Sequence, residues 1–247
     1  YMYGMYKKLA QENTGTFTGK GLEFGGSLIR PEATGYGNIY FLMNMLGRKG
    51  ITDLKGQTIC ISGSGNVATY TAQKAIELGG KVVTMSDSNG YIYDPDGITK
   101  EKLDYIFELK NVYRGRIKEY AEKYGCKYVE GGRPWGEKCT IALPSATQNE
   151  LNGEDAKKLV ANGVIAVSEG ANMPSTPEAI EVFLNAKILY APGKAANAGG
   201  VSVSGLEMTQ NSMKISWTKE EVDSKLKAIM KDIHDACIKY GSEADGY

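Results

Sequence analysis

A short glycine pattern, GSGNVA at 63–68, follows an apolar run and precedes a stretch with helical periodicity. The spacing Gly63-x-Gly65-x-x-Ala68 is typical of a turn that binds the pyrophosphate of a dinucleotide. Gly63 permits the tight turn, Gly65 lets a phosphate approach the backbone, and the small Ala68 lets helix and strand pack closely. A plain strand–turn–helix is the simpler alternative, but the position between strand and helix favours nucleotide binding.

The next apolar run ends in Ser86-Asp87-Ser88. An acidic residue at this position usually accepts a hydrogen bond from the ribose 2′-hydroxyl of NAD. The 2′-phosphate of NADP would be repelled unless hydroxyls or cations compensate, and Ser86, Ser88 and the basic stretch 110–116 offer both. A solvated helix face is the commoner explanation for such a charge run. The residue types therefore leave NAD and NADP open.

Three further polar loops follow apolar runs, at 143–150, 168–174 and 192–201. Asn172 and Asn197 carry amides suited to a carboxamide or a ribose, although asparagine often serves only a turn. Ser204 precedes a helical pattern, so an N-cap role is its simplest explanation. Because ligands of parallel sheets bind at the carboxyl ends of the strands, the recurrence of such loops predicts a site there.

The alternation of short β-branched runs with amphipathic stretches predicts an α/β fold. We expect a Rossmann-like, doubly wound, mostly parallel sheet with flanking helices, followed by a C-terminal helical segment. A helical region is predicted over roughly 100–124 and a turn at Asp94-Pro95-Asp96-Gly97. The expected organisation is an N-terminal helix and glycine-rich loop at 1–27, a nucleotide-binding domain at 28–200, and C-terminal helices at 201–247.

The bulk composition argues against several function classes. Lys and Arg together number 29, as do Asp and Glu, so the balanced charge argues against nucleic acid as a partner. The four cysteines are scattered and His234 is the only histidine, so no metal site is expected. No apolar run reaches membrane-spanning length and no signal peptide opens the chain, so we expect no membrane partner and a cytoplasmic location.

Several strings, taken in order, resemble the hexameric glutamate dehydrogenases. They cover nearly the whole chain and are far more specific together than any one alone; they lie at 20–37, 63–68, 86–98, 141–151, 168–174, 191–201 and 204–212. The resemblance implies reversible oxidative deamination of L-glutamate to 2-oxoglutarate and ammonia, with hydride transfer to a nicotinamide cofactor. The serine–aspartate pair resembles NADP-using bacterial members, so NADP is expected, with NAD as the second candidate.

The resemblance also assigns residues. The implied cofactor-binding residues are Thr34, Gly63, Ser64, Gly65, Asn66, Val67, Ser86, Asp87, Ser88, Lys110, Ala146, Thr147, Asn172 and Asn197. The implied substrate residues are Val201 and Ser204, with Ser204 bound to the side-chain carboxylate of glutamate, a role that outranks helix capping once the family is admitted.

The catalytic lysine and aspartate of that family belong to a substrate domain upstream of this sequence. We therefore expect a piece of a longer protein that binds nucleotide without turnover, with no catalytic residue of its own, and a homohexamer for the full-length protein. The alternatives are a domain of a leucine, phenylalanine or valine dehydrogenase, and a non-catalytic nucleotide-binding module.

Overall fold

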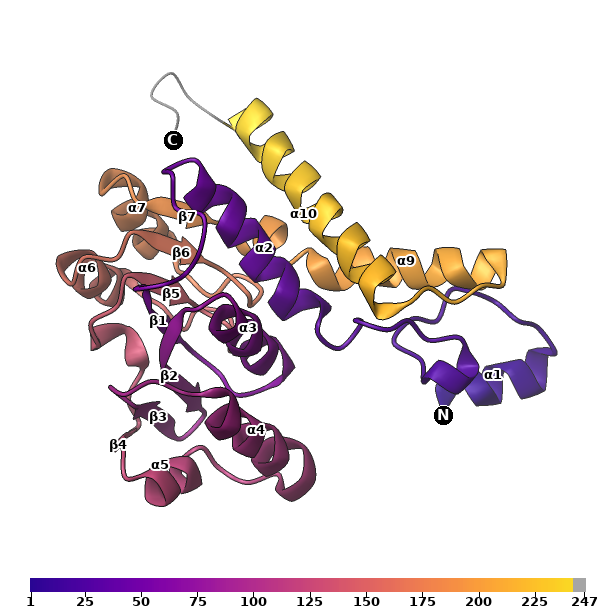
Figure 1. Ribbon diagram of the computed structural model, residues 1–247, viewed down its shortest axis with the longest axis horizontal. Coiled ribbons are helices and arrows are strands. Elements are labelled where there is room, and N and C mark those ends of the chain that lie inside the picture. The colour runs from indigo at the N-terminus through magenta and orange to yellow at the C-terminus, as the bar shows by residue number, and fades with distance from the viewer. Residues whose placement is uncertain (242–247) are drawn as a thin grey trace.

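The computed structural model describes residues 1–241 and is built on one seven-stranded sheet of order β4-β3-β2-β1-β5-β6-β7 (Figure 1). The strands are β1 (Thr58–Ile61), β2 (Lys81–Asp87), β3 (Gly90–Tyr93), β4 (Lys127–Glu130), β5 (Ile141–Leu143), β6 (Ala166–Ser168) and β7 (Leu189–Ala191). Strands β2, β1, β5, β6 and β7 run parallel, whereas β3 and β4 pair antiparallel. The predicted doubly wound, mostly parallel sheet is confirmed.

Helices connect and cover these strands. They are α1 (Met2–Ala10), α2 (Ala33–Gly47), α3 (Asn66–Glu77), α4 (Lys100–Glu108), α5 (Lys118–Tyr124), α6 (Gly153–Ala161), α7 (Pro177–Asn185), α8 (Gly193–Ala196), α9 (Gly199–Met213) and α10 (Lys219–Gly241). Shorter turns are η1 (Leu22–Phe24), η2 (Leu109–Tyr113) and η3 (Pro134–Gly136). The C-terminal helical segment predicted from the sequence is confirmed as α9 and α10.

Two apolar layers lie on opposite faces of the sheet because successive strand side chains point in opposite directions. Ile59 and Ile61 of β1 join the core under α2, α3, α4 and α10. Cys60, between them, joins the core under α6 and α7, which includes Trp135 and Phe183. Helices thus cover both faces of the sheet. Because five of the strands run parallel, the loops that follow them lie at one edge of the sheet.

Local capping residues fix where several helices begin. Asn152 and Asp155 form a reciprocal capping box at the start of α6. The Thr176 side chain caps α7, whose first residue is Pro177, a residue well suited to a first helical turn. Thr99 caps α4 by accepting from the amide of the third residue. These caps satisfy amide groups that a helix leaves unpaired.

The helical region predicted over roughly 100–124 is present, but it is divided into two helices. Helix α4 ends at Glu108, a π-helical turn η2 follows, and Arg114 adopts left-handed backbone geometry with φ of 53°. Helix α5 then begins at Lys118. The basic segment between the helices folds back on itself, because the Lys110 side chain donates to the carbonyl of Gly115 at 2.9 Å.

Strand β3 was not predicted, because the Asp-Pro-Asp-Gly turn directly after it dominated the local pattern. The turn itself is present, with the Gly97 amide bonded to the carbonyl of Asp94 at 3.0 Å. Strand β3 pairs with β2 through a tight connection at 88–89 and then with β4. The antiparallel pair closes the edge of the sheet beyond β2.

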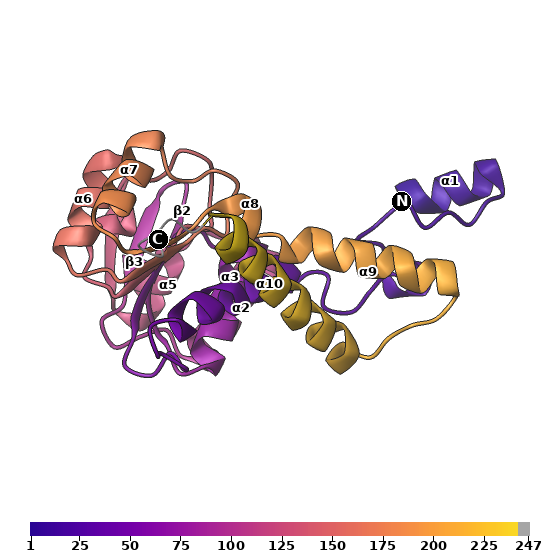
Figure 2. The same cartoon turned by 90° about the horizontal axis from the view of Figure 1, so that it is seen from above.

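Helices α2, α9 and α10 pack together beside the sheet, and α9 runs outward from it toward α1 (Figure 2). The approach of α2 and α9 is very close: a Cβ on Gly199 would lie 2.1 Å from the carbonyl oxygen of Ala33. A Cβ on Gly37 would lie 2.8 Å from the Cα of Gly199. Only glycine permits this contact.

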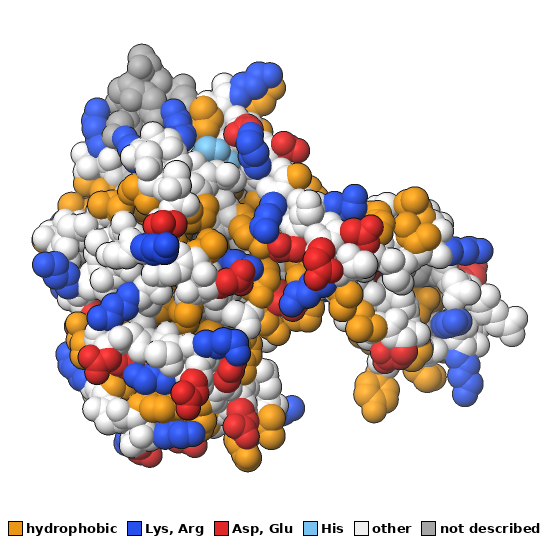
Figure 3. Space-filling view, in the orientation of Figure 1, with side chains coloured by type: hydrophobic (Ala, Val, Ile, Leu, Met, Phe, Trp, Pro, Cys, Tyr) orange, Lys and Arg blue, Asp and Glu red, His pale blue; other side chains and the backbone are white. Residues whose placement is uncertain are grey.

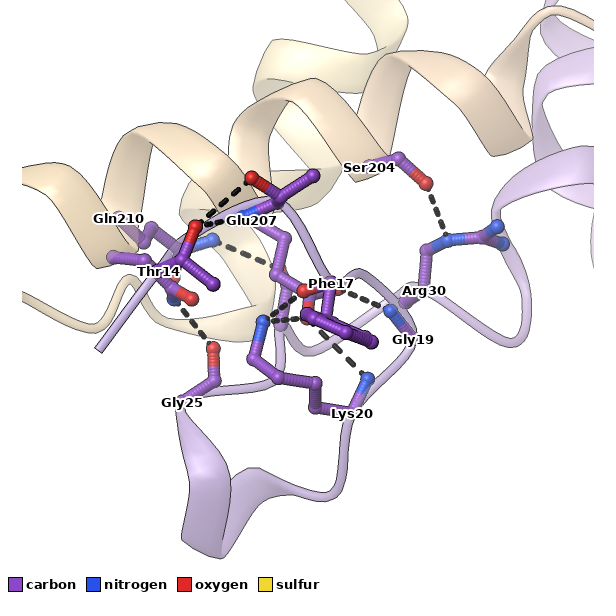
Figure 4. A network of polar contacts seen from close by, with 12 residues as sticks. Thr14, Phe17, Gly19, Lys20, Gly25, Arg30, Ser204, Glu207 and Gln210 are labelled. Carbon is purple, nitrogen blue, oxygen red and sulfur yellow. Dashed lines mark hydrogen bonds and ion pairs between the residues drawn. The ribbon is translucent and has the colours of Figure 1, made fainter. Parts of the chain in front are cut away.

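The glycine-rich segment 13–27 is attached to α9 by a buried polar network (Figure 4). The Lys20 ammonium lies 2.7 Å from the carboxylate of Glu207, and the two side chains are 3% and 0% exposed. The amide of Gly19 donates to the same carboxylate at 2.9 Å, and Lys20 also donates to the carbonyl of Phe17. Gln210, one turn further along α9, donates to Ser27 at 2.8 Å.

Acidic and basic side chains are interspersed over the face shown in Figure 3. Apolar side chains are exposed on α1, where Met2 and Leu9 are 79% and 78% exposed. Within residues 1–241, no helix is long and apolar enough to cross a membrane. The predicted boundaries at 27/28 and 200/201 stay predictions.

The glycine contact between α2 and α9 predicts opposite effects of one methyl group at two places on α9. We expect Gly199→Ala to lower the free energy of unfolding by about 1–3 kcal/mol, because the added Cβ meets the backbone of α2. Gly205→Ala, on the same helix with nothing within 4 Å of its Cβ, should raise it by about 0.5–1 kcal/mol. Urea denaturation measures both, and equal effects would contradict the close contact.

Candidate functional site

A cleft of about 670 Å³ opens at the carboxyl ends of β1, β2 and β5. It gathers most of the residues predicted for the cofactor: Gly63, Ser64, Gly65, Asn66, Val67, Ser86, Asp87, Ser88, Lys110, Ala146 and Thr147. Residues far apart in the sequence therefore meet at one edge of the sheet. Their assignment as cofactor-binding residues stays a prediction.

The glycine turn at the centre of the cleft is fixed from behind. Gly63 has φ of +86°, and its amide donates to the Ser86 hydroxyl at 2.7 Å. The Ser86 amide donates back to the carbonyl of Gly63 at 3.1 Å. Ser86 thus holds the turn, which adds a structural role to the one predicted for it.

Gly65 lies on the open side of the same turn and caps α3. A Cβ built on Gly65 would have nothing within 4 Å, so the backbone is exposed there. The first amides of α3 point out of the helix without intrahelical partners, and the helix dipole adds partial positive charge. This arrangement suits an anionic group resting on the turn.

The loop after β5 is held against the glycine turn by a buried carboxylate. Glu150 accepts from the Ser62 hydroxyl at 2.8 Å and from the Ala146 amide at 3.1 Å. Ser62 in turn accepts from the amide of Ser145 at 2.9 Å. A Cβ on Gly63 would lie only 3.0 Å from the carbonyl oxygen of Ser145. Glu150 therefore sets the distance between two walls of the cleft.

Burial raises the pKa of the Glu150 carboxyl above its usual value. The Ser62 hydroxyl, the amides of Ala146 and Thr147, and the Arg133 guanidinium act in the opposite direction. Arg133 also lines the cleft and donates to the backbone carbonyl of Glu150 at 2.7 Å. The sequence analysis named neither Arg133 nor Glu150 as a site residue; the cation in the GGRPWG string was the available signal.

Cations approach the cleft beside the end of β2. Lys110 lies 3.9 Å from the carboxylate of Asp87. Arg116 donates to the Ser88 hydroxyl at 2.9 Å. Ser88 therefore lies between Arg116 and the cleft. The two cations supply the positive charge that a phosphate next to Asp87 would require.

The remaining predicted residues lie outside the lining of this cleft. Asn172 and Asn197 meet each other: the Asn197 amide donates to the Asn172 side chain at 2.6 Å and to the carbonyl of Ala171 at 3.3 Å. Thr34, in the first turn of α2, faces α9, where a Cβ on Gly200 would lie 2.5 Å from its hydroxyl.

Ser204 and Val201 lie on α9. Helix α9 begins at Gly199, so Ser204 lies inside the helix and the N-cap interpretation was wrong. The Ser204 hydroxyl accepts from Arg30 Nε at 2.9 Å, as Figure 4 shows. Val201 is 72% exposed. The sequence analysis missed Arg30, although it lies in the string 20–37 on which the family resemblance rests.

The match to a family model decides where the chain belongs. Residues 25–247 match the model described as Glutamate/Leucine/Phenylalanine/Valine dehydrogenase. The chain belongs to this family. A protein named glutamate dehydrogenase from Bacteroides thetaiotaomicron is 81% identical over 247 residues, which are 100% of this chain and 55% of that protein.

Other relatives of this dehydrogenase domain carry more specific names. A protein named NAD(P)-specific glutamate dehydrogenase from Xylanibacter ruminicola is 68% identical over 100% of this chain and 55% of its own length. The crystal structure of Plasmodium falciparum glutamate dehydrogenase matches with a TM-score of 0.94 at 51% identity, over 97% of this chain and 51% of that one. The chain spans about half the length of the curated relatives it matches.

The cysteines and acidic residues do not gather into a metal centre in the described part. Among residues 1–241, no group of three or more His, Cys, Asp or Glu side chains is placed to hold a metal ion. All four cysteines are free. A hydrogen bond with Cys139, together with burial, raises the pKa of the Cys60 thiol.

The raised pKa of Glu150 predicts a pH-dependent contribution to stability. A carboxyl with a raised folded-state pKa stabilises the fold fully below its unfolded pKa and loses that contribution as pH rises. Relative to Glu150→Gln, the wild-type chain should therefore lose free energy of unfolding over the pH range that begins near 4.5, the ordinary pKa of the group, and extends upward. Urea denaturation across this range measures the difference.

Glu154→Gln is the control for this comparison. Glu154 is exposed on α6, and its hydrogen bond with Lys157 lowers its pKa. Its contribution is lost as pH falls, so the pH trend of Glu154→Gln should run in the opposite direction. A Glu150→Gln difference that is constant with pH would contradict the buried, pKa-raised carboxylate.

Proposed function

We propose that this chain is the nucleotide-binding part of a glutamate dehydrogenase that interconverts L-glutamate with 2-oxoglutarate and ammonia. The observation that carries the proposal is the cleft at the strand ends, where an open glycine turn, a helix N-terminus and flanking cations converge. The relatives named glutamate dehydrogenase support the choice of reaction.

Successive groups of a dinucleotide can be assigned to successive parts of the cleft. The amides after Gly65 receive the pyrophosphate, and Ser88, Lys110 and Arg116 lie where the adenosine ribose meets the end of β2. The bound nicotinamide supplies the hydride acceptor. Thr34, Asn172 and Asn197 are the candidate contacts for the nicotinamide end of the dinucleotide, beyond the loop that Glu150 holds.

The substrate side of the proposal rests on Arg30 and Ser204. A guanidinium N–H can only donate, so the Ser204 hydroxyl acts as acceptor toward Arg30 and keeps its own proton free to donate. A hydroxyl oriented in this way, with a cation behind it, suits a carboxylate. This favours glutamate over leucine, phenylalanine or valine, whose side chains are apolar.

NADP is the preferred cofactor in this proposal, and NAD is the second candidate. Relatives of both kinds exist. The protein from Haemophilus influenzae is named NADP-specific glutamate dehydrogenase, and the protein from Bacteroides fragilis is named NAD-specific glutamate dehydrogenase. In this chain, Lys110 and Arg116 beside Ser88 offer positive charge to a 2′-phosphate. The full-length protein is proposed to be a homohexamer whose catalytic acid and base lie outside this chain.

A single substitution separates cofactor binding from folding. Gly65→Val should weaken NADPH binding at least tenfold, about 1.4 kcal/mol, because its side chain occupies the space that the pyrophosphate needs. The thermal midpoint should change little, because Gly65 has φ of −86° and open space beside it. Calorimetric titration of wild type with NADPH and NADH should give the tighter binding for NADPH.

Gly47→Val is the matched control, because Gly47 also has open space around its Cβ and lies at the far end of α2. It should leave NADPH affinity unchanged. Equal affinities of the wild type for NADPH and NADH would contradict the NADP preference, and absence of binding of either nucleotide would leave only a scaffold role.

A further inference from the structure

Both oxygens of the Asp87 carboxylate are already hydrogen-bonded to the protein backbone. Oδ1 accepts from the amide of Asn89 at 2.9 Å. Oδ2 accepts from the amide of Ile117 at 2.9 Å, thirty residues further along the chain. The Asp87 side chain is only 7% exposed. It is therefore a buried, charge-assisted acceptor that joins the end of β2 to a distant segment.

That distant segment carries the cations of the cleft. It runs from the π-helical turn η2 through Arg114 to Ile117, the residue before α5. Its backbone is irregular, because Arg114 has a positive φ and Lys110 donates across the turn to Gly115. Residues 114–116 belong to no strand or helix. The amide of Gly115 donates to the carbonyl of Leu109 at 2.9 Å and the amide of Arg116 donates to Glu119 at 2.8 Å, so side-chain contacts act together with local backbone bonds to hold the segment.

Two of these contacts lie next to each other at the end of β2. Asp87 binds the amide of Ile117, and Ser88 binds the guanidinium of the preceding residue, Arg116. Lys110 lies 3.9 Å from the same Asp87 carboxylate. The carboxylate is thus surrounded by two amides and an ammonium, so its negative charge is largely compensated before any ligand arrives.

We propose that Asp87 is a positioning residue for cofactor choice: it anchors the segment 110–117 so that Lys110 and Arg116 present positive charge at Ser88. This rests on the proposed function and deepens it. An acidic residue at the end of this strand would otherwise repel a 2′-phosphate and favour a ribose hydroxyl. In this chain it serves the opposite preference, because its charge holds the cations that meet the phosphate.

The two possible roles of Asp87 predict opposite changes in the ratio of NADPH to NADH affinity when the side chain is removed. If Asp87 repels the phosphate or holds the ribose hydroxyl, Asp87→Ala should strengthen NADPH binding relative to NADH. If it anchors the cations, the ratio of NADPH to NADH affinity should fall. We expect Asp87→Ala to reduce this ratio about tenfold, mostly by weaker NADPH binding.

The salt dependence of NADPH binding provides a readout that a merely structural loss would not give. Fewer cations held at the phosphate mean less counter-ion dependence, so the loss of NADPH affinity with added salt should be shallower in Asp87→Ala. Glu122→Ala, an exposed carboxylate on α5, is the matched control and should leave both the ratio and the salt dependence unchanged.

Asp87→Asn keeps one acceptor oxygen but removes the charge and the second acceptor. The ratio of NADPH to NADH affinity should therefore fall, but by less than in Asp87→Ala. The affinities come from calorimetric titration with NADPH and NADH, with circular dichroism to verify folding. An increase in the ratio in either variant overturns the anchoring role while leaving the proposed function intact; failure of the wild type to bind either nucleotide overturns the function itself.

Discussion

Helix α2 contacts two neighbours through glycines that lie two residues apart and therefore face different directions. A Cβ on Gly35 would lie 2.5 Å from the Thr71 amide of α3, and one on Gly37 would lie 2.8 Å from Gly199 of α9. Helix α3 carries the glycine turn of the nucleotide cleft, whereas α9 carries Ser204. The distance between the proposed cofactor and substrate regions thus depends on two contacts made by glycines of α2. A methyl group added at either glycine would push the neighbouring helix away.

A second feature is shared by several buried carboxylates: each one joins two segments that are separated along the chain. Glu150 binds the end of β1 and the loop after β5. Glu169, which is 2% exposed, accepts from the Tyr190 hydroxyl at 2.9 Å and from the amide of Gly193 at 2.8 Å. Glu207 does the same for the glycine-rich segment before α2. Because a charged acceptor binds amides more strongly than a neutral one, these loops have defined positions without regular secondary structure.

Much of the fold could be predicted because periodicity and turn residues agreed with it. The strand–turn–helix at Gly63, the helices at α6 and α7 and the edge of the sheet on which the polar loops gather followed from local patterns. Strand β3 and the break at Arg114 could not, because both depend on partners elsewhere in the chain: β4 completes the pairing of the strand, and Asp87 binds the segment before α5. Arg30, Arg133 and Glu150 were missed for the same reason, since their contacts lie far away in the sequence.

The ion pair between Lys20 and Glu207 joins residues 187 positions apart. At about 5–20 residues per second, a ribosome needs about 10–40 s to synthesise the chain between them. During that time the segment 13–27, whose Phe17 and Phe24 rings both contact Tyr3, lacks the Glu207 carboxylate that binds it in the finished fold. The segment 13–27, although it is synthesised before the sheet, thus reaches its native contacts only after α9 has been made.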